Sequence, residues 1–439
     1  MKKLNFQKLF CFISMLFILS CCIFYGTRFI KLYLENKKTE VEEKNTLTKK
    51  VKDNNSNNDN FKSVNGQNYF TGKEENNYLI YSNILWRIIK VNDDNSITAI
   101  SDTSITPLAY GKKVLYKDSE IFKWLNKTDD KYSGILESSL NDISKYLQKT
   151  TTCTDKLDEL SNNPCKELDN DSYITLLPVI DYLNIGSKDS YLVNNEFFYL
   201  SNTNSENKAW YADEEGILTL STGTDIIGVR PVITIKSNVE YISGNGSKNN
   251  PYIIEKKNNY FGSYVKLGND TWRIYEVNNN EVKLMLNDYL KVNNKNLTYK
   301  YSNINSYYDD YKQGSIAYYL NHTYLDSLSY KNILKETNWA NGYYNSDTNY
   351  SYAHSLETTI NSKVALLSIG NVFLNSELNN YHIMTGSKQK GSMIYTTNSN
   401  VKARLNQISS EINIVPSICI DKELLKKGNG TIDSPFEME

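Results

Sequence analysis

Few side chains in this sequence of 439 residues have the types and spacing that catalysis or metal binding requires. The 3 histidines, His322, His354 and His382, are far apart, and neither a His-Glu-x-x-His nor a Cys-x-x-Cys motif occurs. The chain also lacks a Gly-x-Ser-x-Gly elbow and a Gly-x-x-x-x-Gly-Lys phosphate loop. We therefore expect no catalytic residues, no metal site and no cofactor. A capping or surface role is expected for His322, which follows a predicted helix.

The cysteines of the chain body divide into one candidate pair and one candidate core residue. Cys153 and Cys165 lie in a polar insert, and in an oxidising exterior such a pair can form a disulfide. Two free thiols in a mobile loop are the alternative. Cys419 stands alone on a predicted buried strand, so we interpret it as part of the core.

Two acidic turns and several aromatic pairs are further candidates for binding. Asp93-Asp94 and Asp213-Glu214-Glu215 offer the oxygen ligands that calcium prefers, but their spacing matches no known calcium loop, which favours solvated turns. We expect Arg230 to pair with a buried carboxylate. Paired aromatic rings could form a platform for a sugar or a peptide, although core packing explains them equally well. These pairs are Tyr307-Tyr308, Tyr343-Tyr344 and Trp210-Tyr211.

The composition indicates a folded protein without a nucleic-acid partner. Hydrophobic residues make up 40% of the chain and charged residues 23%, and the formal net charge is −1. Phosphate binding needs clustered lysine and arginine, and the body of the chain has no strong basic run. The 35 tyrosines belong to a set of residues with AT-rich codons, so their abundance alone supports no functional class.

The N-terminal segment predicts a transmembrane signal-anchor. Residues 9–27 are an uncharged run rich in Leu, Ile and Phe, which as a helix would cross the ~30 Å hydrocarbon core of a bilayer. Basic residues flank the run on both sides, and residues 1–8 are expected to form a cytoplasmic tail because almost the whole folded chain follows the run and must be moved across the membrane. A lipoprotein signal near Cys21 and a cleaved secretory signal are the alternatives. We expect a single-pass protein of the cell membrane that contacts the lipid bilayer through this helix, with the bulk of the chain extracytoplasmic.

Behind the anchor we expect a stalk and two copies of one domain. Residues 28–66 are simple and polar, which predicts a flexible stalk. A first repeat domain at 67–256 and a second, divergent repeat domain at 257–439 follow from landmarks that recur in order at a nearly constant offset. The landmarks are Asn68-Tyr69-Phe70 with Asn259-Tyr260-Phe261, Trp86-Arg87-Ile88 with Trp272-Arg273-Ile274, Tyr116-Lys117 with Tyr311-Lys312, Leu176-Leu177 with Leu366-Leu367, Pro231 with Pro416, and Gly244-Asn245-Gly246 with Gly428-Asn429-Gly430.

Each copy is predicted to be α+β and mostly β. Residues 85–91 and 96–100 flank a turn rich in Asn and Asp, which is typical of a β-hairpin, and residues 272–286 repeat the pattern. Residues 121–125 place apolar side chains on one face of a short helix. Trp86 and its counterpart in the second copy are expected to be buried, because both copies keep an indole at the same place in this hairpin.

The same landmarks resemble a known family. The order Trp86-Arg87-Ile88, Trp124-Leu125-Asn126 and Gly228-Val229-Arg230-Pro231 resembles an uncharacterised bacterial surface domain that is common in low-GC Gram-positive bacteria. That domain is distantly similar to the C-type-lectin-like fold of formylglycine-generating (sulfatase-modifying) enzymes, so the resemblance implies such a fold in each copy. The resemblance covers residues 68–255, and residues 259–439 more weakly.

Three functions follow from these observations. We favour an extracytoplasmic interaction module that binds a glycan, a peptide or another surface protein, because it fits the anchor, the stalk, the duplication and the missing catalytic set. Two weak binding domains would also raise avidity. A formylglycine-generating-type enzyme would need a cysteine pair late in the domain, and the first copy has none there. A passive surface spacer is the third possibility. Ligand-binding residues are not identified by the sequence.

Overall fold

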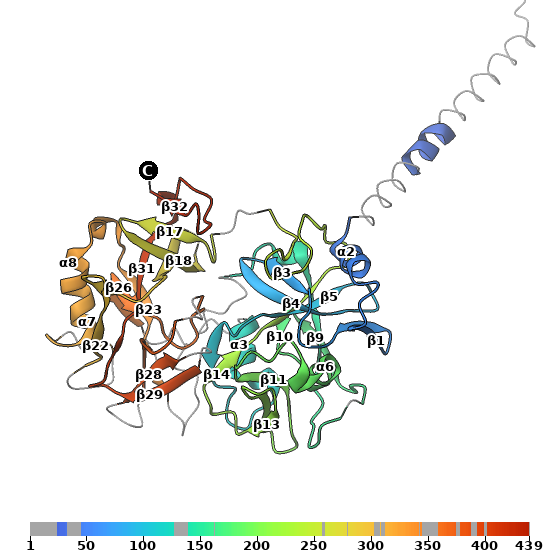
Figure 1. The fold of residues 1–439 in the computed structure, drawn as a ribbon, viewed down its shortest axis with the longest axis horizontal. Coiled ribbons are helices and arrows are strands. Elements are labelled where there is room, and N and C mark those ends of the chain that lie inside the picture. The colour runs from blue at the N-terminus through green and yellow to red at the C-terminus, as the bar shows by residue number, and fades with distance from the viewer. Residues whose placement is uncertain are drawn as a thin grey trace, which may run out of the picture.

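The computed structural model describes residues 24–32, 45–126, 139–161, 163–256, 260–278, 280–302, 308, 312–341, 343–344, 359–374, 378–387, 393–398 and 402–438. The architecture is α+β and mostly β, with several sheets and short helices, as the sequence predicts at this level. Figure 1 shows two lobes side by side. We call residues 45–256 the N-terminal half and residues 260–438 the C-terminal half.

The core sheet of the N-terminal half grows from the predicted hairpin. Its strands follow the order β16-β3-β4-β5-β15-β10, with β16 parallel to β3 and the other neighbours antiparallel. Branched and aromatic residues dominate β4, and Asn95 takes the left-handed conformation in the turn that leads to β5. The bounds are β3 Tyr78–Tyr81, β4 Ile84–Val91, β5 Ile97–Ser101, β10 Ile174–Thr175, β15 Val232–Ile235 and β16 Tyr252–Ile253.

A second sheet and a ribbon complete this half. The second sheet has the order β13-β12-β11-β14-β6, and β8 pairs with β9 in a two-stranded ribbon beside it. Three further strands, β1, β2 and β7, extend the core sheet. The bounds are β1 Phe61–Val64, β2 Gln67–Phe70, β6 Thr106–Leu108, β7 Leu147–Gln148, β8 Thr150–Cys153, β9 Leu168–Ser172, β11 Phe198–Thr203, β12 Ala209–Ala212, β13 Leu218–Ser221 and β14 Ile227–Val229.

The C-terminal half has sheets of the same strand order. Its core sheet is β32-β17-β18-β19-β31-β26, with β32 parallel to β17, and its second sheet is β29-β28-β27-β30-β22. The bounds are β17 Tyr264–Leu267, β18 Asp270–Val277, β19 Glu281–Leu286, β20 Lys291–Val292, β21 Lys295–Asn296, β22 Thr298–Lys300, β23 Thr337–Ala340, β24 Tyr343–Tyr344, β25 Thr359–Ser362, β26 Val364–Leu366, β27 Tyr381–Ser387, β28 Met393–Asn398, β29 Lys402–Gln407, β30 Glu411–Asn413, β31 Pro416–Asp421 and β32 Phe436–Glu437.

Short helices close the ends of these sheets. The predicted helix is α3, where the Ser119 hydroxyl accepts a hydrogen bond from the Phe122 backbone N–H and so caps the first turn. Ser315 caps the equivalent helix α7 in the same way. The bounds are α2 Leu47–Asn54, α3 Glu120–Asn126, α5 Ile143–Tyr146, α6 Val179–Ile185, α7 Ile316–Tyr319 and α8 Leu325–Ser327, with single turns or π segments at Tyr116–Asp118, Ser187–Asp189, Leu320–Tyr324, Lys331–Ile333 and Lys422–Leu424.

The expectation of a flexible stalk at residues 28–66 is wrong for its second part. Helix α2 packs on the N-terminal half with Leu47 and Val51 buried, and β1 joins the core sheet. The reason is that Leu47, Thr48 and Val51 share one helix face, while the simple polar residues that suggested a stalk occupy the other. Residues 33–44 lie outside the described residues.

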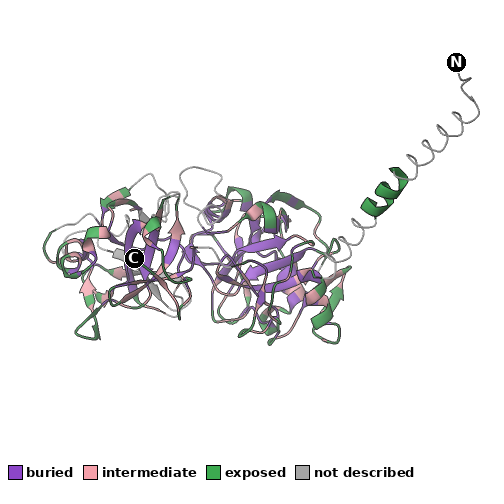
Figure 2. Cartoon of the chain, turned by 90° about the horizontal axis from the view of Figure 1, so that it is seen from above, coloured by how far each residue is buried: buried purple, intermediate pink, exposed green. Residues whose placement is uncertain are grey.

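The predicted anchor falls mostly outside the described residues, which begin at residue 24. Residues 24–32 are helical, and their large apolar side chains, among them Phe24 and Phe29, are exposed (Figure 2). Within the described part of the chain, no helix is both long and apolar enough to cross a membrane.

The two halves have separate sheets but touch closely. No described strand of one half pairs with a strand of the other. The Trp124 indole N–H nevertheless donates to the Gly370 carbonyl at 2.8 Å, and the Phe373 backbone N–H donates to the Ile105 carbonyl at 2.7 Å. Trp124 and Phe373 are buried at this joint. The domain boundary at 256–257 stays a prediction, but separating the halves there would break both hydrogen bonds.

Candidate functional site

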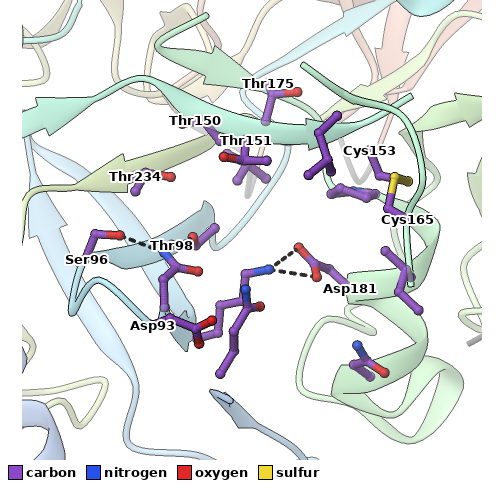
Figure 3. Close-up of a pocket in the computed structure, with 18 of the residues that line it drawn as sticks. Asp93, Ser96, Thr98, Thr150, Thr151, Cys153, Cys165, Thr175, Asp181 and Thr234 are labelled. Carbon is purple, nitrogen blue, oxygen red and sulfur yellow. Dashed lines mark hydrogen bonds and ion pairs between the residues drawn. A yellow bond between two sulfur atoms is a disulfide. The ribbon is translucent and has the colours of Figure 1, made fainter. Parts of the chain in front are cut away.

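A groove in the N-terminal half is the best candidate for a binding site. Its cavity of about 410 Å³ lies over the outer part of the core sheet, between the β4–β5 turn, the β8–β9 ribbon and helix α6 (Figure 3). Lys90 on β4, Thr98 on β5 and Thr234 on β15 form one row across its floor, because these residues pair in register from strand to strand. Three residues that are distant in sequence therefore face the same space.

An ion pair forms one wall of the groove. The Lys90 ammonium lies 2.9 Å from one oxygen of the Asp181 carboxylate, which also accepts a hydrogen bond from the Tyr69 hydroxyl at 2.7 Å. All three side chains are largely buried. Burial first, and then the charge of Asp181, raises the pKa of Tyr69 far above its ordinary value, so its hydroxyl stays a donor. The pair holds α6 against β4 and gives the groove a fixed polar wall.

The floor of the groove offers hydroxyls to a ligand. Thr234 is 4% exposed and its side chain has no hydrogen-bond partner among the described residues, although it lines the cavity. The Thr98 hydroxyl accepts a hydrogen bond from the Asn92 side chain and keeps its own proton available. A hydroxyl that faces a cavity without a protein partner can hydrogen-bond water or a ligand there. The row is thus suited to hydrogen-bond a polar ligand.

The predicted disulfide lies on the same side of the groove as Asp181 (Figure 3). Cys153 and Cys165 are bonded, with 5.7 Å between their Cα atoms. The Asp155 carboxylate accepts hydrogen bonds from the backbone N–H groups of Lys166 and Glu167, which closes the loop. Cys153, Asp155 and Cys165 also lie close enough together to resemble a metal-ligand set. Both sulfurs are used in the disulfide, however, so neither is a thiolate ligand here.

The equivalent row in the C-terminal half is closed. The matching pairing register places Glu276 on β18, Lys283 on β19 and Cys419 on β31 where the other half has Lys90, Thr98 and Thr234. Lys283 forms an ion pair with Glu276 at 2.9 Å, and its ammonium lies 5.3 Å from the centre of the Trp339 ring. Trp339 is buried on β23, the counterpart of β8. A large ring and an ion pair therefore fill this position.

Arg230 does not form the direct ion pair with a carboxylate that we expected from the sequence. Its guanidinium is buried and donates to the backbone carbonyls of Ser101, Asp102 and Leu192. Burial lowers its pKa, and the nearby Glu196 opposes that change. Carbonyl groups take the place of the ion pair because Arg230 sits where three chain segments meet, so it ties these segments together and does not reach the groove.

The histidines and Cys419 have structural positions where they are described. His322 is exposed and stacks on Tyr318, with 4.3 Å between ring centres, which fits the expected surface role. His382 is buried, bonds to the Tyr299 carbonyl at 2.8 Å, and has a pKa lowered to about 4 by burial. His354 lies outside the described residues. Cys419 is buried, as expected, and burial raises the pKa of its thiol to about 12.

Among the described residues the aromatic pairs form no exposed platform, and the acidic turns form no metal site of their own, although Asp93 and Asp94 line the groove. Trp210 is 7% exposed and Tyr308 is 1% exposed, so neither offers a face to a ligand. The side chains of Tyr307, Tyr343 and Tyr344 lie outside the described part. Asp94 and Asp213 accept hydrogen bonds from backbone N–H groups of their own turns, which confirms the interpretation as turns.

Both tryptophans of the repeated hairpins are fully buried, as the sequence predicts. The groove, by contrast, was not found from the sequence. Its residues carry no motif. The one signal in the sequence is that Thr98 and Thr234 alternate with apolar neighbours on buried strands, which could have indicated that these threonines line a cavity. Comparison of the chain with protein-family models, curated proteins and solved structures finds no match.

Proposed function

We propose that this protein is an extracytoplasmic ligand-binding module whose site is the groove of the N-terminal half. The observation that carries the proposal is the row Lys90, Thr98 and Thr234, which lines a cavity and includes a Thr234 hydroxyl without a hydrogen-bond partner among the described residues. A protein that needed only to fill space would be expected to close the row, as the C-terminal half does with Trp339.

The two halves are proposed to be tandem copies of one domain. The shared strand order of both sheets supports a duplication, including the parallel pairs β16–β3 and β32–β17. One copy would then have kept an open site while the other closed it. The C-type-lectin-like fold implied by the family resemblance belongs to the same proposal. One site per chain also removes the avidity that two equal sites would provide.

The location of the module is also a proposal. The uncharged run at residues 9–27, the exposed apolar side chains of residues 24–32 and the disulfide between Cys153 and Cys165 all favour a membrane-anchored chain whose folded part lies in an oxidising exterior. The ligand would then be a glycan, a peptide or another surface protein that the module meets outside the cell.

The test uses the full chain in detergent, applied to arrays of bacterial surface glycans and of 12-residue peptides. Thr234→Val removes the hydroxyl at nearly constant volume and should weaken binding about fivefold, the effect of one hydrogen bond. Cys419→Val, at the equivalent position of the closed row, is the matched control and should leave binding unchanged. We expect one bound ligand per chain.

Unchanged binding by the Thr234→Val protein would show that the groove is not the site. No binding on either array would favour a passive spacer over a binding module.

A further inference from the structure

The groove does not end at the disulfide. A second cavity, of about 580 Å³, lies on the far side of the Cys153–Cys165 loop, and the two cavities share four wall residues. These are Cys153, Pro164, Cys165 and Ile180. The second cavity continues toward Tyr116 and the start of the 153–165 loop, with Ser201 and Thr203 of β11 in its floor. The disulfide loop therefore separates two neighbouring cavities, which together we call the channel.

The lining of both cavities is poor in aromatic faces. Its described aromatic residues are Tyr69 and Tyr116, which are 3% and 4% exposed, and both hydroxyls are hydrogen-bonded inside the protein. The Tyr116 ring is also packed edge-on against Phe122. Proteins commonly bind a sugar chain by stacking exposed aromatic side chains on its sugar rings. The described lining of these cavities provides no such exposed aromatic side chain.

Aliphatic side chains are spaced along the channel instead. Leu168 at the first cavity is 59% exposed and Leu115 at the second is 42% exposed, while Ile180 and Pro164 lie between the cavities. Both cavities also present hydroxyls beside these apolar groups, among them Thr234 in the first cavity and Thr203 in the second. An extended peptide can use both kinds of group, because its backbone presents amide groups while its side chains point alternately to either side.

The two cavities also differ in charge. The first is lined by three carboxylates and two ammonium groups, and its exposed Asp93 has no ion-pair partner among the described residues. The second is lined by three lysines and two carboxylates, and its exposed Lys156 and Lys166 have no described ion-pair partner. Two neighbouring cavities with opposite unpaired charges orient a chain that carries complementary charges.

We propose that the ligand is an extended peptide segment that crosses the Cys153–Cys165 loop and occupies both cavities, with an acidic residue beside Lys156 and Lys166 in the second cavity. The inference rests on the proposed function of the groove and adds the class and orientation of its ligand. Because the segment spans two cavities, its affinity depends on length. Because the ends differ in charge, its affinity also depends on direction.

The experiment selects 12-residue peptides from a displayed library on the full chain and shortens each binder to 4 residues. The short peptides should bind at least about tenfold more weakly. Lys156→Glu with Lys166→Glu should lower the affinity for acidic-ended peptides about tenfold, and peptides of reversed sequence should bind more weakly than the originals. Lys295→Glu, an exposed position outside both cavities, is the control and should change nothing.

Three outcomes separate the two proposals. Glycan binding that Thr234→Val weakens, without peptide binding, would overturn the peptide inference and keep the groove. Equal affinity for the short and long peptides would show that one cavity suffices and would also overturn it. Peptide binding that neither Thr234→Val nor the lysine substitutions change would place the site elsewhere and overturn both.

Discussion

Two buried tryptophans of the N-terminal half allow a test of whether the halves fold as one unit. Trp86 and Trp124 are both 0% exposed. They differ in the hydrogen-bond acceptor of the indole N–H. Trp86 donates to the Tyr81 carbonyl in its own half at 3.0 Å, and Trp124 donates to the Gly370 carbonyl of the other half at 2.8 Å. Replacing each by alanine therefore removes the same type of side chain, in one case from the interior of the N-terminal half and in the other from the joint between the halves.

The expected cost is similar for both substitutions. Emptying a large aromatic site costs about 3–5 kcal/mol, and the lost hydrogen bond adds about 1 kcal/mol. For Trp86→Ala the loss should stay in the N-terminal half, because distant sites act independently. For Trp124→Ala it should also reach the segment 364–374, where Gly370 and Phe373 lie, since the cavity opens at the joint.

Hydrogen exchange on the full chain measures both effects. A local loss of about 3 kcal/mol raises the exchange of the affected amides by roughly a hundredfold. Trp86→Ala should raise it in β3, β4 and β5 only, whereas Trp124→Ala should raise it in segment 364–374 as well. Trp124→Phe, which keeps most of the ring and removes the N–H, should give a small effect at the same segment. If Trp124→Ala left segment 364–374 unchanged, the halves would be independent, and cutting at Lys256-Lys257 would yield two cooperative units, as the sequence alone predicts.

Three further outcomes are expected. The pKa of His382 is about 4 in the folded chain against an ordinary value near 6.5, so only the unfolded chain takes up this proton as the pH falls from 6.5 to 4. Up to about 3 kcal/mol of stability is therefore lost in that window. Denaturant unfolding of His382→Gln should show a flatter dependence of stability on pH, and a slope equal to that of the wild type would contradict this. Replacing Cys153 and Cys165 by serine should cost about 2–3 kcal/mol and abolish the effect of reductant on thermal unfolding, so a wild-type melting temperature that reductant does not change would refute the reasoning. Alkaline phosphatase fused to the C-terminus, active only after export, should be active at the cell surface, and activity of a cytoplasmic reporter alone would rule out the anchor proposed at residues 9–27.

The sequence by itself determined what depends on neighbouring residues. The hairpin of β4 and β5, the helix at residues 121–125 and the burial of Trp86 follow from local periodicity and turn chemistry, which act over a few positions. The recurrence of landmarks also pointed to the matching strand orders, because a duplicated sequence carries the same local preferences twice. Helix α2 was missed, and its residues were assigned to a stalk, because it has so few apolar residues that composition outweighed its periodicity.

Only the tertiary structure decided where distant residues meet. Lys90, Thr98 and Thr234 share one row because of the order β4-β5-β15 and its pairing register, and sequence spacing does not encode that register between separate segments. The same register places Glu276, Lys283 and Cys419 together in the C-terminal half, where Trp339 from another strand fills the space. A groove is space that side chains leave unfilled, so whether it exists depends on packing between segments that local patterns do not contain.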